Sequence, residues 1–172
     1  MRKIIYMIGA ALVATLPSAI GAQADHSTQD QTFVNEAARG GMMEVQLGKL
    51  AEQNASNPIV KQFGERMVTD HTRLNNELGS TAKSIGLNVP DTLSKEQQTE
   101  YDKLAKLSGT AFDTAYMKLM VKVHTSDLAA FRKEEAATQN QDLKAVITKE
   151  AIPVISAHLA LAKSDSSKLA AR

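Results

Sequence analysis

The sequence predicts an all-α protein, an up-down four-helix bundle with a short extra helix in the connection between helices 2 and 3. Apolar residues recur at three- and four-residue spacing over long stretches, and no stretch alternates as a half-buried strand does. Short turns at Asn57-Pro58 and Gln139-Asn140 separate long helical stretches, so each turn joins two antiparallel neighbours. The longer connection between the two hairpins leaves open whether they pack in simple up-down order or with a crossover.

The first helix is expected over residues 31–55, with Asp30 as its N-cap, and the polar residues 25–31 are expected to be frayed. Gly40, Gly41 and Gly48 lower its helix propensity and permit the close approach of a neighbouring helix. Its inward-facing stripe is expected to be Phe33, Ala37, Gly40, Glu44, Leu47 and Ala51.

The second helix is expected over residues 58–85. Asn57 is a suitable N-cap, Pro58 fits the first helical position, and Gly86 is a natural C′ residue. The inward-facing stripe is expected to be Phe63, Met67, His71, Leu74 and Leu78. An imidazole in the middle of this apolar stripe needs a polar partner.

A capping box at Ser94 opens the short extra helix, expected over residues 95–107. Two further long helices are expected over residues 110–138 and 141–168, and Pro153 should kink the last one. The inward residues of the third long helix are expected to be Phe112, Tyr116, Leu119 or Met120, Val123 or His124, Asp127 and Phe131. Those of the fourth are expected to be Ile147, Ala151, Val154, His158 and Leu161.

The start of the chain has the features of a secretory signal peptide. The basic pair Arg2-Lys3 precedes an apolar run over residues 4–16 that is too short to span a bilayer. Ala22-Gln23-Ala24 then matches the small-x-small pattern of a signal-peptidase site. We therefore expect a signal peptide over residues 1–24, one mature domain over residues 25–172, and periplasmic localisation. Cleavage one or two residues earlier and an uncleaved membrane anchor are the alternatives.

The composition limits the classes of function. The chain has no Cys, which excludes disulfides, thiolate metal sites and a lipid-anchored lipoprotein. Loss of Arg2 and Lys3 changes the net charge from +1 to −1, because 18 basic residues then remain against 19 acidic ones. A near-neutral surface without Trp favours no nucleic-acid partner, and we expect no stable membrane insertion of the mature chain. A homo-oligomer is compatible with the sequence.

One polar residue occupies an inward position on each long helix: Glu44, His71, His124 and His158. Counted from the first turn at 1.5 Å per residue, Glu44 and His71 differ in height by about 4 Å. Counted in the same way from the second turn, His124 and His158 differ by about 6 Å. We therefore expect the four side chains to meet near the middle of the bundle. One carboxylate and three imidazoles are a metal-ligand set that suits Cu, Zn or Fe.

Other residues are candidates to hold these ligands in place. Asp127 follows His124 by one turn and is expected to orient its ring, and Asp113 and Tyr116 lie further back on the same helix. The alternative interpretation is a hydrogen-bonded polar layer that fixes the register of the helices and binds no metal.

Four motifs resemble those of one protein family. They are Ala38-x-x-Gly41-Met-x-Glu44-Val-x-Leu-Gly-x-Leu-Ala51, Val60-Lys-x-Phe63-x-x-x-Met67-Val-x-Asp70-His71, Leu107-Ser-Gly-x-x-Phe112-Asp113-x-x-Tyr116 followed by His124, and Ile152-Pro153-x-x-x-x-His158-Leu159. With these motifs the chain resembles the bacterial exported proteins grouped as domain of unknown function 4142, a ferritin-like helical family. The resemblance covers nearly all of the mature chain. It implies a ferritin-like four-helix bundle in the cell envelope and does not imply an activity.

The di-iron site of true ferritins is not part of the resemblance. That site uses a Glu-x-x-His pair on each of two helices. Here Val68, Val121 and Ile155 stand three residues before the three inward His residues. We therefore do not expect oxidase or iron-storage chemistry by that template.

Three functions compete on this sequence. The first is a periplasmic metal-binding bundle, and the second is a non-catalytic envelope stress or interaction protein with a structural polar layer. The third and weakest is a ferritin-like redox enzyme with Tyr116 near the metal. No Ser-His-Asp arrangement, glycine-rich phosphate loop or paired-carboxylate site stands out, so hydrolase and nucleotide chemistry are not expected.

Overall fold

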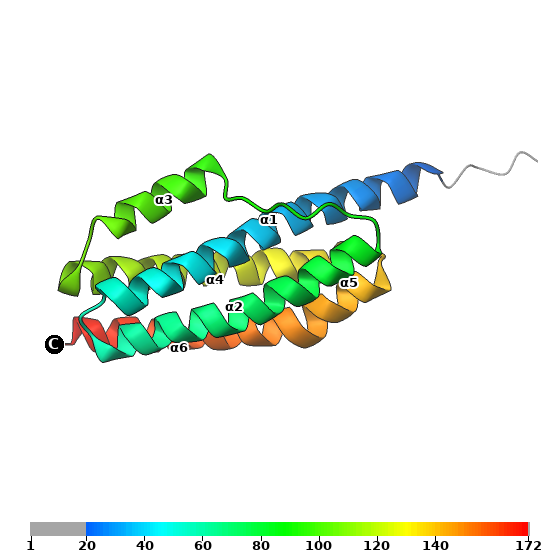
Figure 1. Cartoon of the computed structure of the whole chain (residues 1–172). Helices are drawn as coiled ribbons and strands as arrows, with labels where there is room; N and C mark the ends of the chain where they lie inside the picture. Colours follow the sequence, from blue (N-terminus) through cyan, green and yellow to red (C-terminus); the bar gives the residue numbers. More distant parts are fainter. Residues whose placement is uncertain (1–19, 172) are drawn as a thin grey trace, which may run out of the picture.

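The computed structural model describes residues 20–171, and every secondary-structure element in this range is helical (Figure 1). The elements are α1 (Ile20–Asn54), α2 (Pro58–Ser84), α3 (Lys95–Ala105), α4 (Gly109–Ala137), α5 (Gln141–Val146), η1 (Ile147–Ala151) and α6 (Ile152–Ala170). The expected all-α class is therefore confirmed. Most of the expected signal peptide, residues 1–19, lies outside the described residues, and residues 20–24 begin α1.

Four long helical segments lie side by side: α1, α2, α4 and the continuous run of α5, η1 and α6 (Figure 1). α1 packs on α2 and α4, and α6 packs on α4 and α2. α2 and α4 run in the same direction, because residues 85–108 carry the chain back along the molecule. The two hairpins are thus joined by a crossover, which is one of the two packing orders that the sequence left open, and the simple up-down order does not hold between them. The predicted capping box at Ser94 opens α3 within this connection, where α3 contacts α1 and α4.

α1 begins earlier than the sequence predicts. The polar residues 25–31, expected to be frayed, are helical, and Asp30 lies inside α1 instead of capping it. The Asp30 side chain is buried and hydrogen-bonds to Glu134 of α4. One residue earlier, Gln29 Nε2 donates to Glu134 Oε2 over 2.9 Å. Contacts with a distant helix hold this polar stretch in α1, and the local sequence carries no sign of them.

The limits of α2 follow the sequence closely. Asn57 Oδ1 accepts a hydrogen bond from the backbone N–H of Ile59 over 3.0 Å, as the predicted N-cap should. At the other end, Gly86 has a φ of 80°, which a residue without a side chain adopts at little cost. The N–H of Leu87 donates to the carbonyl of Ala82 over 2.9 Å and closes a Schellman motif. The predicted N-cap and C′ glycine are both confirmed.

α1 and α2 approach closely where two glycines face each other. A Cβ added to Gly48 would lie 2.6 Å from the carbonyl oxygen of Gly64, and one added to Gly64 would lie 2.8 Å from the carbonyl oxygen of Gly48. Gly41 is covered by the side chain of Asn75, but a Cβ at Gly40 would meet no described atom within 4 Å. The expected close approach of a neighbouring helix is therefore confirmed at Gly48 and is wrong at Gly40.

The fourth long helix contains a π turn, η1. The N–H of Ile152 donates to the carbonyl of Ile147, five residues back, and Pro153 follows directly. Proline has no N–H to donate and its ring crowds the preceding turn, so a helix distortion next to it has a physical cause. The expected kink takes the form of this widened turn.

The π turn also changes which side chains face inward. Buried residues follow at four-residue spacing through it: Leu143, Ile147, Ala151 and Ile155. A regular α-helix rotates about 40° too far over four residues to keep such a stripe in line, and a wider turn compensates. Ile155 and Ala162 are therefore buried, where the sequence analysis expected Val154 and Leu161.

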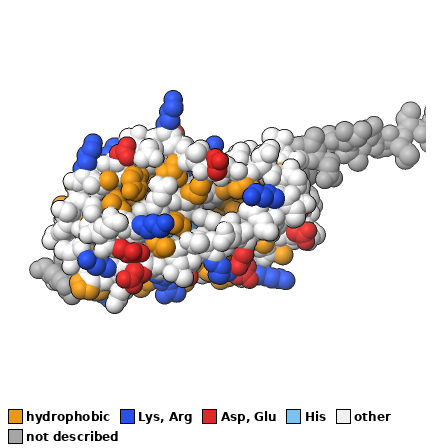
Figure 2. All heavy atoms as spheres, viewed as in Figure 1, with side chains coloured by type: hydrophobic (Ala, Val, Ile, Leu, Met, Phe, Trp, Pro, Cys, Tyr) orange, Lys and Arg blue, Asp and Glu red, His pale blue; other side chains and the backbone are white. Residues whose placement is uncertain are grey.

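The segment Gln141–Ala170 is long and apolar enough, by length and composition, to cross a membrane. A helix that builds a protein core passes the same test, and this one packs along α4. Figure 2 shows charged side chains of both signs interspersed with apolar ones over one face of the molecule. The expectation that the mature chain does not insert into a membrane stays a prediction.

Polar residues divide the apolar core. One core cluster contains Phe63 and Met67, while Leu74 and Leu78 belong to other clusters further along α2. His71 is buried on the same helix between Met67 and Leu74. A polar layer thus separates two apolar regions of the core, at the level where the sequence predicts it.

Candidate metal centre

Glu44, His71, His124 and His158 form one buried group, here called the central cluster. Each residue of the cluster comes from a different helix, in the order α1, α2, α4 and α6. Glu44 is 2% exposed, His71 is 4% exposed, and the other two are 0% exposed. The centroids of the three imidazole rings lie 5.2–5.7 Å apart. The structure thus brings together the four residues that the sequence analysis singled out.

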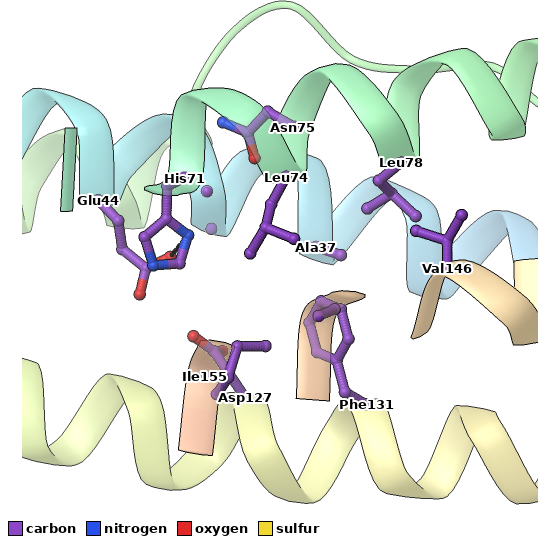
Figure 3. A pocket seen from close by; sticks show the side chains of 13 residues that line it. Ala37, Glu44, His71, Leu74, Asn75, Leu78, Asp127, Phe131, Val146 and Ile155 are labelled. Carbon is purple, nitrogen blue, oxygen red and sulfur yellow. Dashed lines mark ion pairs between the residues drawn. The ribbon is translucent and has the colours of Figure 1, made fainter. Parts of the chain in front are cut away.

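Each imidazole has one nitrogen bonded to an oxygen acceptor. His71 Nδ1 lies 3.0 Å from Glu44 Oε2 (Figure 3), and His158 Nε2 lies 2.8 Å from Asp70 Oδ2. His124 Nδ1 lies 2.9 Å from a backbone carbonyl oxygen one turn earlier on α4. A neutral ring must place its single N–H proton on the nitrogen that faces such an oxygen. The other nitrogen of each neutral ring then carries a free lone pair.

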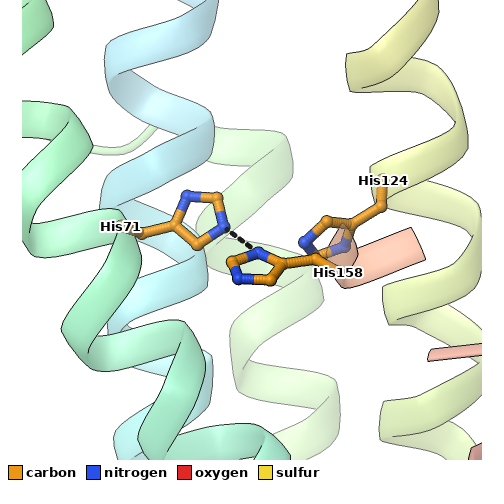
Figure 4. Close-up of side chains that lie close together, drawn as sticks. All are labelled: His71, His124 and His158. Carbon is orange, nitrogen blue, oxygen red and sulfur yellow. Dashed lines mark hydrogen bonds between the residues drawn. The ribbon is translucent and has the colours of Figure 1, made fainter. Parts of the chain in front are cut away.

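The three rings gather around a common point (Figure 4). One nitrogen from each ring lies within 4.8 Å of those of the other two, and His71 Nε2 lies 3.3 Å from His158 Nδ1. A tetrahedral ion with bonds of about 2.0–2.1 Å to nitrogen holds neighbouring ligand nitrogens roughly 3.4 Å apart. Small shifts of the side chains therefore suffice to close the set around one ion.

A proton on His71 satisfies part of the same group without a metal ion. Burial acts to lower the pKa of His71, but the charge and the hydrogen bond of Glu44 outweigh it and raise that pKa above its ordinary value. A doubly protonated His71 donates to Glu44 from Nδ1 and to His158 from Nε2. Burial lowers the pKa of His158 to about 4 and also lowers that of His124, so these two rings are neutral near pH 7.

Glu44 Oε1 and His124 Nε2 lie 3.4 Å apart, and neither atom has a hydrogen-bond partner within the described part of the chain. Because neutral His124 keeps its proton on Nδ1, both facing atoms are acceptors. Burial acts to raise the pKa of Glu44, but His71 more than offsets this, so the pKa is lowered and the carboxylate stays charged. Two buried acceptors in this arrangement repel each other unless a cation or a second proton lies between them.

Asp113 and Tyr116 do not hold the imidazoles as the sequence analysis expected. The Asp113 carboxylate accepts hydrogen bonds from Ser56 Oγ over 2.6 Å and from the N–H groups of Ser56 and Asn57 over 3.1 and 3.0 Å. It therefore fixes the turn between α1 and α2. The Tyr116 ring stacks on Phe112, and its hydroxyl is buried with no hydrogen-bond partner among residues 20–171.

Asp127 does not orient His124, because the Nδ1 of that ring bonds to the carbonyl of Met120. Asp127 instead lines a small cavity beside the central cluster, together with Glu44 and His71 (Figure 3). The cavity measures about 30 Å³, which is room for roughly one or two waters, and its other lining is mostly apolar. Burial, and then the charge of Glu44, raise the pKa of Asp127 to about 8.

Asp70 contacts the central cluster, a role that the sequence pattern did not predict. It precedes His71 directly and lies on the neighbouring face of α2, where it reaches His158 of α6. Arg66, one turn earlier, lies 3.3 Å from the same carboxylate oxygen. Burial opposes ionisation of Asp70, but the hydrogen bonds and charges of His158 and Arg66 together outweigh it and lower the pKa. The available signal was an acidic residue adjacent in sequence to an inward-facing His.

The model of a family described as "Domain of unknown function (DUF4142)" matches residues 15–164 of the chain. No curated protein and no solved structure matches the sequence. The matched range includes the whole central cluster together with Asp70 and Asp127.

Proposed function

Because the chain belongs to a family described only as a domain of unknown function, DUF4142, we propose a function from the geometry of its core: it binds one transition-metal ion through His71, His124 and His158. Glu44 provides a fourth ligand atom, Oε1, on the side that faces His124. Asp70 holds the ring of His158 from outside the ligand set.

The observation that carries this proposal is the pattern of hydrogen bonds around the three rings. A metal-bound histidine donates its second ring nitrogen to a carboxylate or a backbone carbonyl, which fixes the tautomer and the orientation of the ring. All three rings of the central cluster make such a bond, two to carboxylates and one to a carbonyl. A layer selected only for packing would instead match each acceptor with a donor.

The ligand types narrow the choice of metal. Imidazole nitrogen suits Cu²⁺, Zn²⁺ and Fe²⁺, and three imidazoles with one carboxylate complete a four-coordinate set. The four long helices form a ferritin-like four-helix bundle in this proposal, since one long crossover, here over residues 85–108, is the connection of ferritin-like folds. The site binds a single ion, because the Glu-x-x-His pairs of di-iron proteins are missing from the sequence.

We also propose that the protein acts in the periplasm after removal of residues 1–24. The basic start, the apolar run and the Ala22-Gln23-Ala24 site support export. Intact-mass analysis of a periplasmic extract should give a chain that starts at Asp25, or at Gln23 by the alternative site. Full-length chain in the membrane fraction would contradict the proposal.

The metal proposal is tested by the metal-induced rise in melting temperature. Protein stripped with a chelator is given Cu²⁺, Zn²⁺ or Fe²⁺, and an ion at a hundredfold excess over its Kd should stabilise the fold by about 2.7 kcal/mol. His124→Ala and His158→Ala should each lose this increment. Leu74→Ala, a core truncation outside the ligand set, should lower stability by roughly 2–5 kcal/mol and keep it. If stripped and metal-loaded wild type melt together, the proposal is wrong.

A second candidate is a non-catalytic envelope protein whose central cluster is a structural layer. The raised pKa of His71 favours it, since a proton on that ring links Glu44 and His158 without a metal. In that case the same His variants lower the melting temperature equally with chelator and with metal, because each leaves a buried partner unpaired. The size of the metal-induced shift in each variant separates the two functions.

A further inference from the structure

We propose that cations reach the central cluster through an opening between Gly40 of α1 and Asp127 of α4. This route rests on the proposed metal binding and adds to it the path by which the ion enters. The side chains of the cluster are 0–4% exposed, so an ion has no direct access to the ligand nitrogens from solvent. A path through the helix packing is therefore required.

Two hollows meet at Gly40 and Asp127. The outer one is a groove of about 450 Å³ between α1, α3 and α4, and both residues line it. The inner one is the cavity of about 30 Å³ beside the cluster, and the same two residues line it. Glu44 and His71 also line the inner cavity but not the groove. Gly40 and Asp127 thus form a wall between the solvent-facing groove and the inner cavity.

The two residues of this wall suit the passage of a small cation. Gly40 has no side chain, and a Cβ there would meet no described atom within 4 Å, so the backbone of α1 leaves space at this point. Figure 3 shows the Asp127 carboxyl group at the same end of the cavity as Glu44 and His71. No hydrogen bond or ion pair of Asp127 is found among the described residues, so its oxygens are free to contact an ion. Carboxylate oxygen, which Asp127 provides when it is ionised, is a ligand for each of the proposed metals.

The charged residues of the groove favour cations at its mouth. Three carboxylates line it outside Asp127, against two basic side chains; these residues are Glu36, Glu96, Glu100, Arg39 and Lys122. A cleft lined by an excess of one sign concentrates ions of the opposite sign. A cation then passes Gly40, meets Asp127, and reaches Glu44 Oε1, the buried acceptor without a hydrogen-bond partner in the described chain. From there it is 3.4 Å to His124 Nε2.

The test measures the rate of Cu²⁺ uptake by stripped protein in a stopped-flow absorbance experiment. Gly40→Leu fills the opening and should slow uptake by about tenfold, the effect of roughly 1.4 kcal/mol on a barrier, with the stoichiometry and the final spectrum unchanged. Asp127→Asn removes the ionisable carboxyl group and should slow uptake by a smaller factor. Gly40→Ala adds only a Cβ, which meets no described atom within 4 Å, so this variant should take up Cu²⁺ at the wild-type rate. If the Leu variant fails to fold, Asp127→Asn carries the test.

Gly79→Leu is the matched control. Gly79 is also a helical glycine with space around it, since a Cβ there meets its nearest neighbour, Val89 Cγ1, at 3.9 Å, but it lies outside both hollows. This variant should take up Cu²⁺ at the wild-type rate. Wild-type rates in both Gly40→Leu and Asp127→Asn, with Cu²⁺ bound normally, would overturn the route and leave the metal site intact. Wild type that binds no metal would overturn both the proposed function and this route.

Discussion

The central cluster and the carboxyl pair Asp30–Glu134 are both buried between α1 and α4, yet they differ in the signs of their charges. In the central cluster a carboxylate faces imidazoles, and the pKa of Glu44 is lowered while that of His71 is raised. In the carboxyl pair two acids face each other, and burial together with Asp30 raises the pKa of Glu134 despite the hydrogen bond from Gln29. The first group is stable when charged, and the second is stable when it holds a proton.

This difference shows which buried polar group suits a metal. One shared proton completes the carboxyl pair, because Asp30 Oδ1 and Glu134 Oε1 are buried acceptors without another partner in the described chain and the pKa of Glu134 is raised. The central cluster contains more acceptor atoms than protons at neutral pH, since two of its three rings have lowered pKa values. An excess of lone pairs, with the rings already oriented from outside, is what a metal ion requires.

The largest expected effect comes from Glu44→Ala. Removing this carboxylate leaves His71 buried without its counter-charge, and loss of one partner from a buried pair costs about 3–5 kcal/mol. Urea denaturation of metal-free protein near pH 7 measures the free energy of unfolding. Glu44→Gln keeps the shape and an acceptor oxygen and should cost less. Equal losses for the two variants would mean that packing, and not charge, makes Glu44 important.

Asp127→Asn should stabilise the metal-free protein. The pKa of Asp127 is about 8 in the folded state against an ordinary value of 3.8, so folding takes up a proton between these pH values. Stability contributed by this group is present below pH 4 and is lost as the pH rises toward 8. The amide that replaces the Asp127 carboxyl group stays neutral at every pH and so avoids this loss of stability. The variant should therefore raise the free energy of unfolding by roughly 1–3 kcal/mol near pH 8, with no gain near pH 4. A gain of the same size at both pH values would contradict this account.

Metal affinity should fall as the pH drops. An ion at the central cluster must displace the proton of His71, whose pKa is raised, so binding competes with protonation below that pKa. Each pH unit below it should weaken binding about tenfold, or roughly 1.4 kcal/mol. Isothermal titration calorimetry with Zn²⁺ in buffers of different ionisation enthalpy counts the protons released. Binding that is independent of pH would place the ion away from His71.

The smallest effect is expected for Glu134→Gln in the carboxyl pair. The raised pKa of Glu134 means that stability falls as the pH rises above 4.5, the ordinary value for Glu. A glutamine donates permanently to Asp30 and still accepts from Gln29, so the variant should gain about 0.5–1.5 kcal/mol at neutral pH. Metal should not change this gain. A metal-dependent gain would show that the two polar groups are coupled through α1 and α4.

The sequence predicted those features that local chemistry determines. Asn57, Gly86 and Ser94 set helix limits through hydrogen bonds to atoms a few residues away, and all three were identified in advance. The level of the four inward polar residues followed from the helical rise and two short turns, because both are local quantities.

Features that depend on distant contacts were missed. Asp30 is helical because of Glu134, 104 positions later, and Asp70 serves a histidine on another helix. The direction of the crossover depends on how two finished hairpins pack, and neither hairpin encodes it locally. Asp127 was assigned to the nearest His on its own helix, whereas the cavity that it lines is formed by several helices.

The π turn Ile147–Ala151 makes the central cluster sensitive to the geometry of one helix turn. If the segment formed a regular α-helix with all its residues, everything after the turn would rotate by about 100° and move by about 1.5 Å relative to the residues before it. His158 would then leave the core, while Leu143 would keep its place. Deleting one residue from the turn would remove the surplus, and the shorter regular helix would again face His158 inward. The π turn thus absorbs one residue and keeps the last imidazole directed at the core.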